Sequence, residues 1–72
     1  MKFQIPMVRV GDRLEIAWHA DMTVADLVDR VPEGRDCAAV RVNGRIVARP
    51  NFHRTPVPDG ARVYLVPMIA GG

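Results

Sequence analysis

The sequence predicts an α+β fold in which one helix packs on one face of a mixed sheet of about five strands. The chain has 72 residues, which is enough for one domain. Segments of alternating hydrophobicity surround a single segment with helical periodicity, in the order β-β-α-β-β-β. Turn sequences such as Asn43-Gly44 separate these segments. One helix leaves the other sheet face open, and in so small a domain an open face is more often a docking surface than an active site.

The first two strands are expected to form a hairpin. Pro6 lacks the amide donor that a strand ladder needs, so the first regular strand is expected to begin near Met7. A turn at Gly11 follows. The next strand alternates cleanly and places three apolar side chains on one face: Leu14, Ile16 and Trp18.

The single helix is expected to begin after Thr23 and to end at Pro32 and Gly34. The Thr23 hydroxyl can cap the first turn, and Asp26 stands where a capping box places its acidic residue. The helix is short and needs the sheet for stability. It has one apolar stripe at helical spacing, made of Val24, Leu27, Val28 and Val31.

Three more strands are expected after the helix. Residues 38–42 and 45–48 flank Asn43-Gly44, a strong hairpin signal because both turn residues tolerate positive φ. Residues 49–58 contain three prolines and are expected to form a connection. Residues 62–67 alternate again and are expected to form the last strand.

Composition disfavours two classes of partner. Ten Lys and Arg residues against eight Asp and Glu give a formal net charge of +2 at pH 7. The cations are interspersed with acids, and aromatic residues make up only 6% of the chain, so nucleic-acid binding is not expected. No apolar run approaches the roughly 18–20 residues that a membrane span needs, and the first residues lack the apolar stretch of a secretory signal. We expect a cytoplasmic protein without a membrane partner.

The side chains offer no convincing catalytic or metal-binding cluster. Cys37 is the single cysteine, lacks an evident activating base and is expected to pack in or beside the core. His19 and His53 have no acidic or cysteine neighbour at ligand spacing and are expected to be exposed loop residues. Asp26 and Asp29 are expected to lie on a solvated helix face. Nucleotide-binding motifs are missing from the sequence, so we expect that this chain by itself binds no ATP or dinucleotide cofactor. Because no side-chain cluster is convincing, we also expect that it binds no metal and that it is not an enzyme.

The C-terminal sequence Ile69-Ala70-Gly71-Gly72 is the remaining distinctive feature. Glycine lacks Cβ, so such a segment can extend through a narrow channel. The terminal carboxylate has no neighbouring side chain to block a reactant, and a mobile arm can carry it into the active site of another protein. We therefore expect a folded domain over residues 1–67 and a flexible tail over residues 68–72.

Three segments and the Gly-Gly ending resemble the β-grasp sulfur carriers; the segments are residues 23–28, 42–47 and 49–52. This ubiquitin-like family includes ThiS of thiamin biosynthesis and MoaD of molybdopterin biosynthesis. The three segments are similar to the helix start of ThiS, its second hairpin and the segment after that hairpin, where an Arg and an aromatic residue recur. The resemblance covers nearly the whole chain, is closest to ThiS and implies a ubiquitin-like β-grasp fold.

The resemblance also implies a mechanism centred on Gly72. An E1-like adenylating enzyme (ThiF-like) binds the exposed sheet face, takes Ile69, Ala70 and Gly71 into its channel, and uses ATP and magnesium to adenylate the Gly72 carboxylate. Sulfur that ultimately comes from a cysteine desulfurase then converts the adenylate to a thiocarboxylate. For a ThiS-like protein the implied acceptor is thiazole synthase (ThiG-like).

Three other interpretations stay open at the level of sequence. The first is a MoaD-like carrier for molybdopterin or another acceptor. Pro67 resembles that branch of the family, which often has a proline at this position. The second is a ubiquitin-like modifier that forms isopeptide bonds through Gly72, although the sole lysine, Lys2, leaves little scope for chains. The third is a β-grasp interaction module without tail chemistry.

Overall fold

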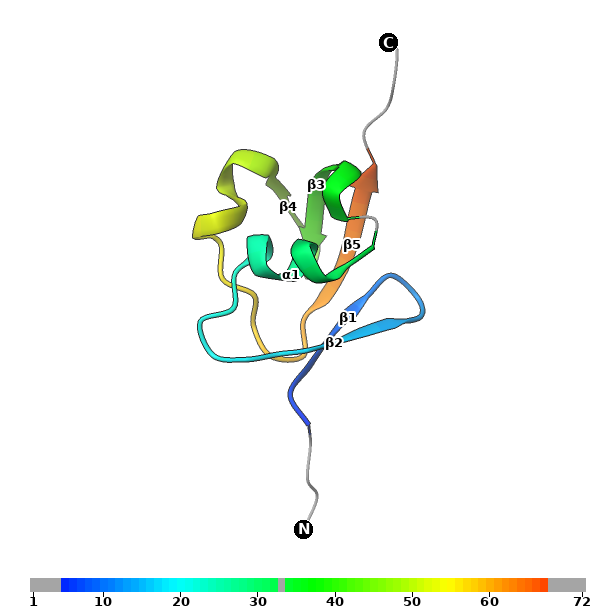
Figure 1. The fold of residues 1–72 in the computed structure, drawn as a ribbon, viewed down its shortest axis with the longest axis vertical. Coiled ribbons are helices and arrows are strands. Elements are labelled where there is room, and N and C mark those ends of the chain that lie inside the picture. The colour runs from blue at the N-terminus through cyan, green and yellow to red at the C-terminus, as the bar shows by residue number, and fades with distance from the viewer. Residues whose placement is uncertain (1–4, 33, 68–72) are drawn as a thin grey trace.

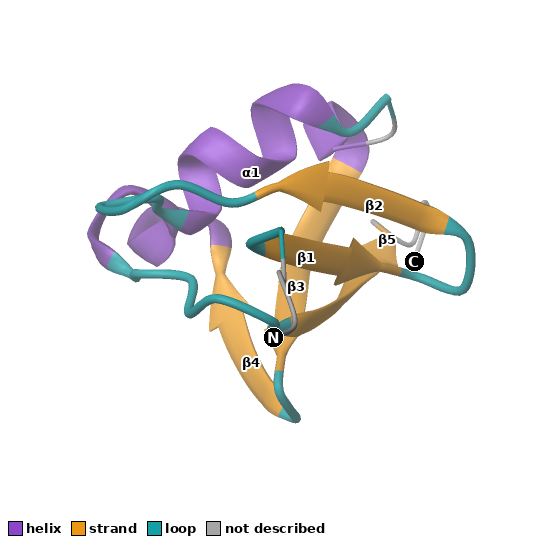
Figure 2. Cartoon of the chain, turned by 90° about the horizontal axis from the view of Figure 1, so that it is seen from below, coloured by secondary structure: helices purple, strands orange, loops and turns teal. Residues whose placement is uncertain are grey.

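The computed structural model describes residues 5–32 and 34–67. It confirms the α+β prediction, because one main helix lies across one face of a five-stranded mixed sheet (Figures 1 and 2). The strands and helices are β1 (Met7–Val10), β2 (Leu14–Ala17), α1 (Val24–Arg30), the 3₁₀ helix η1 (Gly34–Asp36), β3 (Cys37–Val42), β4 (Arg45–Ala48), the 3₁₀ helix η2 (Arg49–Arg54) and β5 (Arg62–Pro67). None of the helices in the described part is long and apolar enough to cross a membrane.

The sheet has the strand order β2-β1-β5-β3-β4, with β5 in the centre. Three neighbouring pairs are antiparallel, and the pair β1–β5 is parallel. The β1–β5 register joins Arg9 to Arg62 and Val10 to Val63. Because β1 ends at Val10, the second half of β5 extends beyond its neighbour.

The capping box that the sequence predicts at the start of α1 is present. The Asp26 amide donates to Thr23 Oγ1 at 3.2 Å, and the Thr23 amide donates to Asp26 Oδ2 at 3.0 Å. The shorter Asp side chain therefore reaches back as the preferred Glu does. The whole apolar stripe of the helix, Val24, Leu27, Val28 and Val31, is buried against the sheet.

The hydrogen bonds to Thr23 hold the pKa of Asp26 below its ordinary value of 3.8, first through the backbone amide and then through the hydroxyl. A carboxyl group whose pKa is lower in the folded protein than in the unfolded chain stabilises the fold when the pH is above both values. This stabilisation is lost as the pH falls through the folded-state pKa. We expect the urea midpoint of the wild-type protein to exceed that of Asp26→Asn by a constant amount above about pH 5, and the difference to shrink at lower pH. Trp18 fluorescence can follow both transitions, and a difference that does not change with pH would contradict the role of the carboxylate.

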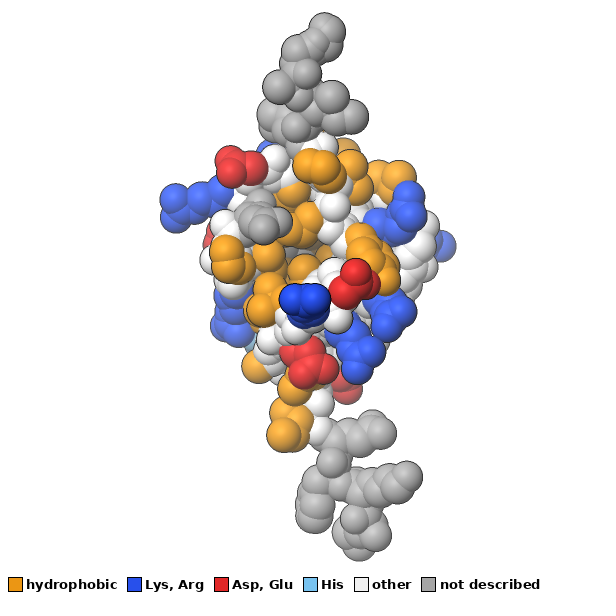
Figure 3. Space-filling model, turned by 90° about the vertical axis from the view of Figure 1, so that its right-hand side faces the viewer, with side chains coloured by type: hydrophobic (Ala, Val, Ile, Leu, Met, Phe, Trp, Pro, Cys, Tyr) orange, Lys and Arg blue, Asp and Glu red, His pale blue; other side chains and the backbone are white. Residues whose placement is uncertain are grey.

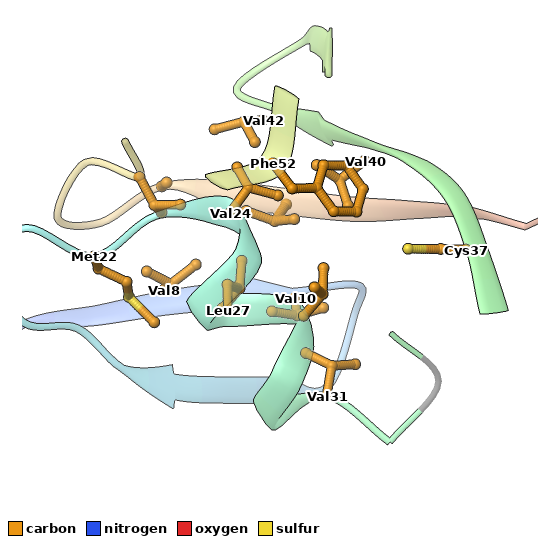
Figure 4. Close-up of a cluster of buried hydrophobic side chains, with 14 residues drawn as sticks. Val8, Val10, Met22, Val24, Leu27, Val31, Cys37, Val40, Val42 and Phe52 are labelled. Carbon is orange, nitrogen blue, oxygen red and sulfur yellow. The ribbon is translucent and has the colours of Figure 1, made fainter. Parts of the chain in front are cut away.

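The core lies between α1 and the sheet and gathers side chains from β1, β3, β5 and the helix (Figure 4). A difference from the sequence prediction concerns residues 49–58, which are more than a connection. Residues Arg49–Arg54 form η2, and Phe52 from this helix is 4% exposed and packs in the core. A single aromatic residue among prolines gives no periodic signal in the sequence. The helical conformation of η2 is therefore stabilised by the burial of Phe52, which the local sequence pattern does not reveal.

Candidate docking face and tail root

The residues that the sequence singles out for chemistry, Ile69, Ala70, Gly71 and Gly72, lie outside the described residues. The structure describes the strand from which they continue, because β5 ends at Pro67. It also describes the sheet face opposite α1.

The sheet face opposite α1 presents exposed apolar side chains next to arginines. Side chains alternate along each strand, so the residues between the buried valines point away from the helix. Arg41 on β3 lies opposite Tyr64 on β5 and Ile46 on β4. Ile46 is 65% exposed and Tyr64 is 38% exposed, which makes them two of the large hydrophobic residues that the fold leaves in contact with solvent. We call Tyr64, Ile46, Arg41 and Arg62 the docking face.

The charges on this side of the sheet are mainly positive. Arg9 lies opposite both Glu15 and Arg62, and its Nε is 3.7 Å from Glu15 Oε2. Both side chains of that pair are about half exposed, so the pair contributes little. It is the one ion pair within residues 5–32 and 34–67, and Arg41 and Arg62 therefore have no carboxylate partner there. Exposed apolar side chains that alternate with these guanidinium groups suit an acidic protein surface.

Arg49 holds the segment that supports the end of β5. Cys37 pairs with Pro67, the last residue of that strand. The Arg49 side chain donates through Nε to the Cys37 carbonyl at 3.0 Å, and through Nη2 to the carbonyls of Gly34 at 3.2 Å and Arg35 at 2.8 Å. Its guanidinium also lies over the Phe52 ring, 5.4 Å from the centroid. One guanidinium group thus donates hydrogen bonds to three carbonyls where η1 meets β3. The local sequence pattern gave no sign of these contacts.

Comparison with known proteins agrees with the resemblance. Residues 3–72 match the sequence model of the ThiS family, which is nearly the whole chain. The chain belongs to the ThiS family. Membership confirms the predicted likeness to ThiS-like sulfur carriers. A search among curated proteins finds no match.

A solved ThiS structure has the same fold. The crystal structure of the thiamine biosynthesis protein ThiS from Geobacter metallireducens superposes with a TM-score of 0.67, covers 92% of this chain and 99% of its own, and is 23% identical in sequence. This likeness confirms the ubiquitin-like β-grasp fold.

Cys37 is a core residue in this ThiS-family chain, as predicted. Its side chain is 2% exposed, and its thiol donates to the Gly34 carbonyl at 3.0 Å. An incoming sulfur donor cannot reach a group buried in this way. Under the thiocarboxylate mechanism that the resemblance implies, we therefore expect Cys37→Ser to form product within about twofold of the parent rate when incubated with an adenylating enzyme and a sulfur source. Loss of product from a variant that is still folded would instead identify the thiol as a sulfur relay.

The other side chains considered from the sequence are not brought together. His19 and His53 are both exposed, and His53 lies in η2 and not in a loop. Asp26 is occupied by the helix cap, and Asp29 is exposed on the outer side of α1. Within the described ranges, His, Cys, Asp and Glu form no group of three or more that could hold a metal ion.

Proposed function

We propose that the Gly72 carboxylate of this sulfur carrier is adenylated, converted to a thiocarboxylate, and then used as the sulfur donor for the thiazole ring of thiamin. The observation that carries the proposal is the match to the ThiS family, which runs from residue 3 through the terminal residue 72. The shared fold supports it, and so does the name of the solved relative, a thiamine biosynthesis protein. The chain is then a protein cosubstrate of other enzymes, in the cytoplasm, and not a catalyst.

The proposed chemistry takes place in the active sites of partners. A carboxylate oxygen of Gly72 attacks the α-phosphorus of ATP, held with magnesium by an E1-like adenylating enzyme, and pyrophosphate leaves. A persulfide sulfur, supplied ultimately by a cysteine desulfurase, then attacks the acyl carbon and displaces AMP. A second thiol then attacks the sulfur of the persulfide carrier in the remaining S–S bond, forms a disulfide with it and releases the thiocarboxylate. Thiazole synthase accepts this sulfur in a site that keeps water away from it.

The docking face supplies the binding energy in this scheme. Contacts made far from the reacting atoms hold the carrier on its partner, while the C-terminal segment alone enters the active site. Exposed Ile46 and Tyr64 give an apolar contact, and Arg41 and Arg62 attract carboxylates on the partner. Binding is therefore expected to weaken as ionic strength rises.

Charge reversal tests the docking face. Arg41→Glu is expected to raise the KM of the adenylating enzyme for the carrier about tenfold or more, with kcat near the parent value, because the reacting segment is unchanged. Arg54→Glu is the matched control, since it makes the same change in net charge at an exposed position of η2, on the side of α1. Equal KM values for the two variants would contradict the assignment of this face.

Reconstitution tests the acceptor. The carrier is incubated with ATP, the adenylating enzyme, a cysteine desulfurase and cysteine, and the product is divided between thiazole synthase and the large subunit of molybdopterin synthase, each with its other substrates. We expect sulfur transfer in the thiazole synthase reaction. Transfer only in the other reaction would support a MoaD-like role, and attachment of Gly72 to protein lysines would support a modifier.

A further inference from the structure

Within residues 5–32 and 34–67, the second half of the central strand β5 has no partner strand on the side of β1. Arg9 and Gly11 donate their amides to the carbonyls of Ala61 at 3.0 Å and Val63 at 2.8 Å, so the peptide groups of alternate residues in β5 face β1. Leu65 is the next residue in this series. β1 has ended at Val10, and no backbone hydrogen bond joins Leu65 to the β1–β2 turn within the part of the chain that the structure describes.

The intervening residues of β5 face the other way. The Asn43 amide donates to the Arg62 carbonyl at 2.8 Å, and the same register pairs Arg41 with Tyr64 and Ala39 with Val66. Alternation then directs the amide and carbonyl of Leu65 to the vacant side. Pro67 points its nitrogen to that side as well. A residue without an N–H is tolerated at this position because no neighbouring strand uses the donor.

A hollow of about 490 Å³ lies against this edge. Its walls come from the residues that follow α1 (Val31 and Pro32), from the β1–β2 turn and from Tyr64 and Leu65. A second hollow, lined by Asp36, Cys37, Leu65 and Pro67, also borders Leu65. Figure 3 views this side of the molecule, where apolar side chains gather between Arg and acidic side chains.

We propose that an extended segment of the adenylating partner occupies this hollow and adds as a strand to the free edge of β5 at Leu65. The inference rests on the proposed function and deepens it. Strand addition combines main-chain hydrogen bonds with pockets for alternate side chains, and the edge offers both. Tyr64 belongs to the docking face and also lines the hollow, so one partner contacts both surfaces without a break.

The location explains why this edge and not another would be used. β5 is the strand that leads into the C-terminal segment, so a strand paired with Leu65 fixes the direction in which that segment leaves the domain. An added strand can pair only with the amide of Leu65 and with the carbonyls of Leu65 and Pro67, because Pro67 has no N–H. So short an edge gives a contact that can be released after each turnover and discourages long-lived pairing between copies.

Hydrogen exchange of the full chain tests the inference. In the free protein the Leu65 amide is expected to exchange at least about tenfold faster than the amides of Tyr64 and Val66, which face β3. Saturation with the adenylating enzyme is expected to slow Leu65 by at least about tenfold. A complex in which Leu65 is unprotected would overturn the inference and leave the proposed function standing. Absence of any complex would overturn both, and Leu65 protection that rises with the concentration of the free protein would assign the edge to a second copy of the chain.

A backbone substitution gives a second test. Chemical synthesis with an ester in place of the Leu65 amide removes one outward donor without changing a side chain, and it is expected to weaken partner binding about threefold to tenfold. The matched control is an ester at Ala48, whose amide points outward from the opposite edge of the sheet by the same alternation. Each ester also weakens one carbonyl that is paired with β3, so their effects on the fold are comparable. Equal binding by the two ester proteins would contradict strand addition at β5.

Discussion

Deletion of Gly72 is expected to abolish adenylation and to leave the fold intact. Gly72 lies outside the described residues, which end with β5 at Pro67, so the deletion removes none of the buried side chains that form the described core. The new terminal carboxylate falls one residue, up to about 3.5 Å, short of the nucleotide in the partner. Reacting atoms must approach within about 3–3.5 Å of each other, so this displacement is sufficient to stop the reaction. ATP-dependent release of pyrophosphate in the presence of the adenylating enzyme measures the step.

Two controls separate chemistry from binding. The shortened chain is expected to compete with the full chain for the adenylating enzyme, because its docking face is unchanged. Gly71→Val keeps the length of the chain and is expected to slow adenylation by crowding the channel and restricting φ. Release of pyrophosphate by the shortened chain at the parent rate would contradict the role of the Gly72 carboxylate.

Substitution of Gly34 by alanine is expected to be strongly destabilising. Gly34 begins η1 directly after the turn that follows α1, and its amide donates to the Val31 carbonyl at 2.9 Å. A Cβ at this position would lie 2.1 Å from the Val28 carbonyl oxygen and 2.8 Å from the carbonyl carbon. These are backbone atoms of α1 that cannot rotate away, so either the helix or the turn must shift. We expect a loss of about 3 kcal/mol or more in the free energy of unfolding.

Gly60→Ala is the matched control for this effect. Gly60 has φ of +77°, but a Cβ there meets no atom within 4 Å. The cost is then limited to left-handed strain of about 1–2 kcal/mol. Urea unfolding followed by Trp18 fluorescence gives both values, and equal losses for the two variants would contradict the close contact described at Gly34.

Local signals were sufficient for most of the fold. The Thr23–Asp26 capping box and the helix stripe are chemical patterns that depend on neighbouring residues. Asn43-Gly44 likewise forms the predicted turn, with φ of +49° and +88°. These features could be predicted because their energies are decided within a few residues.

The features that were not predicted depend on residues far apart in the sequence. η2 forms because Phe52 reaches the core and Arg49 reaches the turn before β3, and neither contact leaves a periodic pattern. The free edge at Leu65 depends on β1 ending at Val10, two residues before the position that would pair with Leu65, which is a matter of register. The open sheet face could be expected from the presence of one helix. That Arg41 and Arg62 have no carboxylate partner within the described residues could not be predicted, because it depends on which residues face them across the neighbouring strands.

The most direct measurement for the central claim is fragment mass analysis of the carrier after reaction with the adenylating enzyme, ATP and a sulfur donor. Intact mass alone is insufficient, because oxidation of one of the four Met residues changes the mass by nearly the same amount as replacement of oxygen by sulfur. We predict that the added mass is found only in fragments that contain Gly72, and only when ATP and the adenylating enzyme are present. Sulfur found on Cys37 or elsewhere in the domain, with an unmodified C-terminal fragment, would contradict the account.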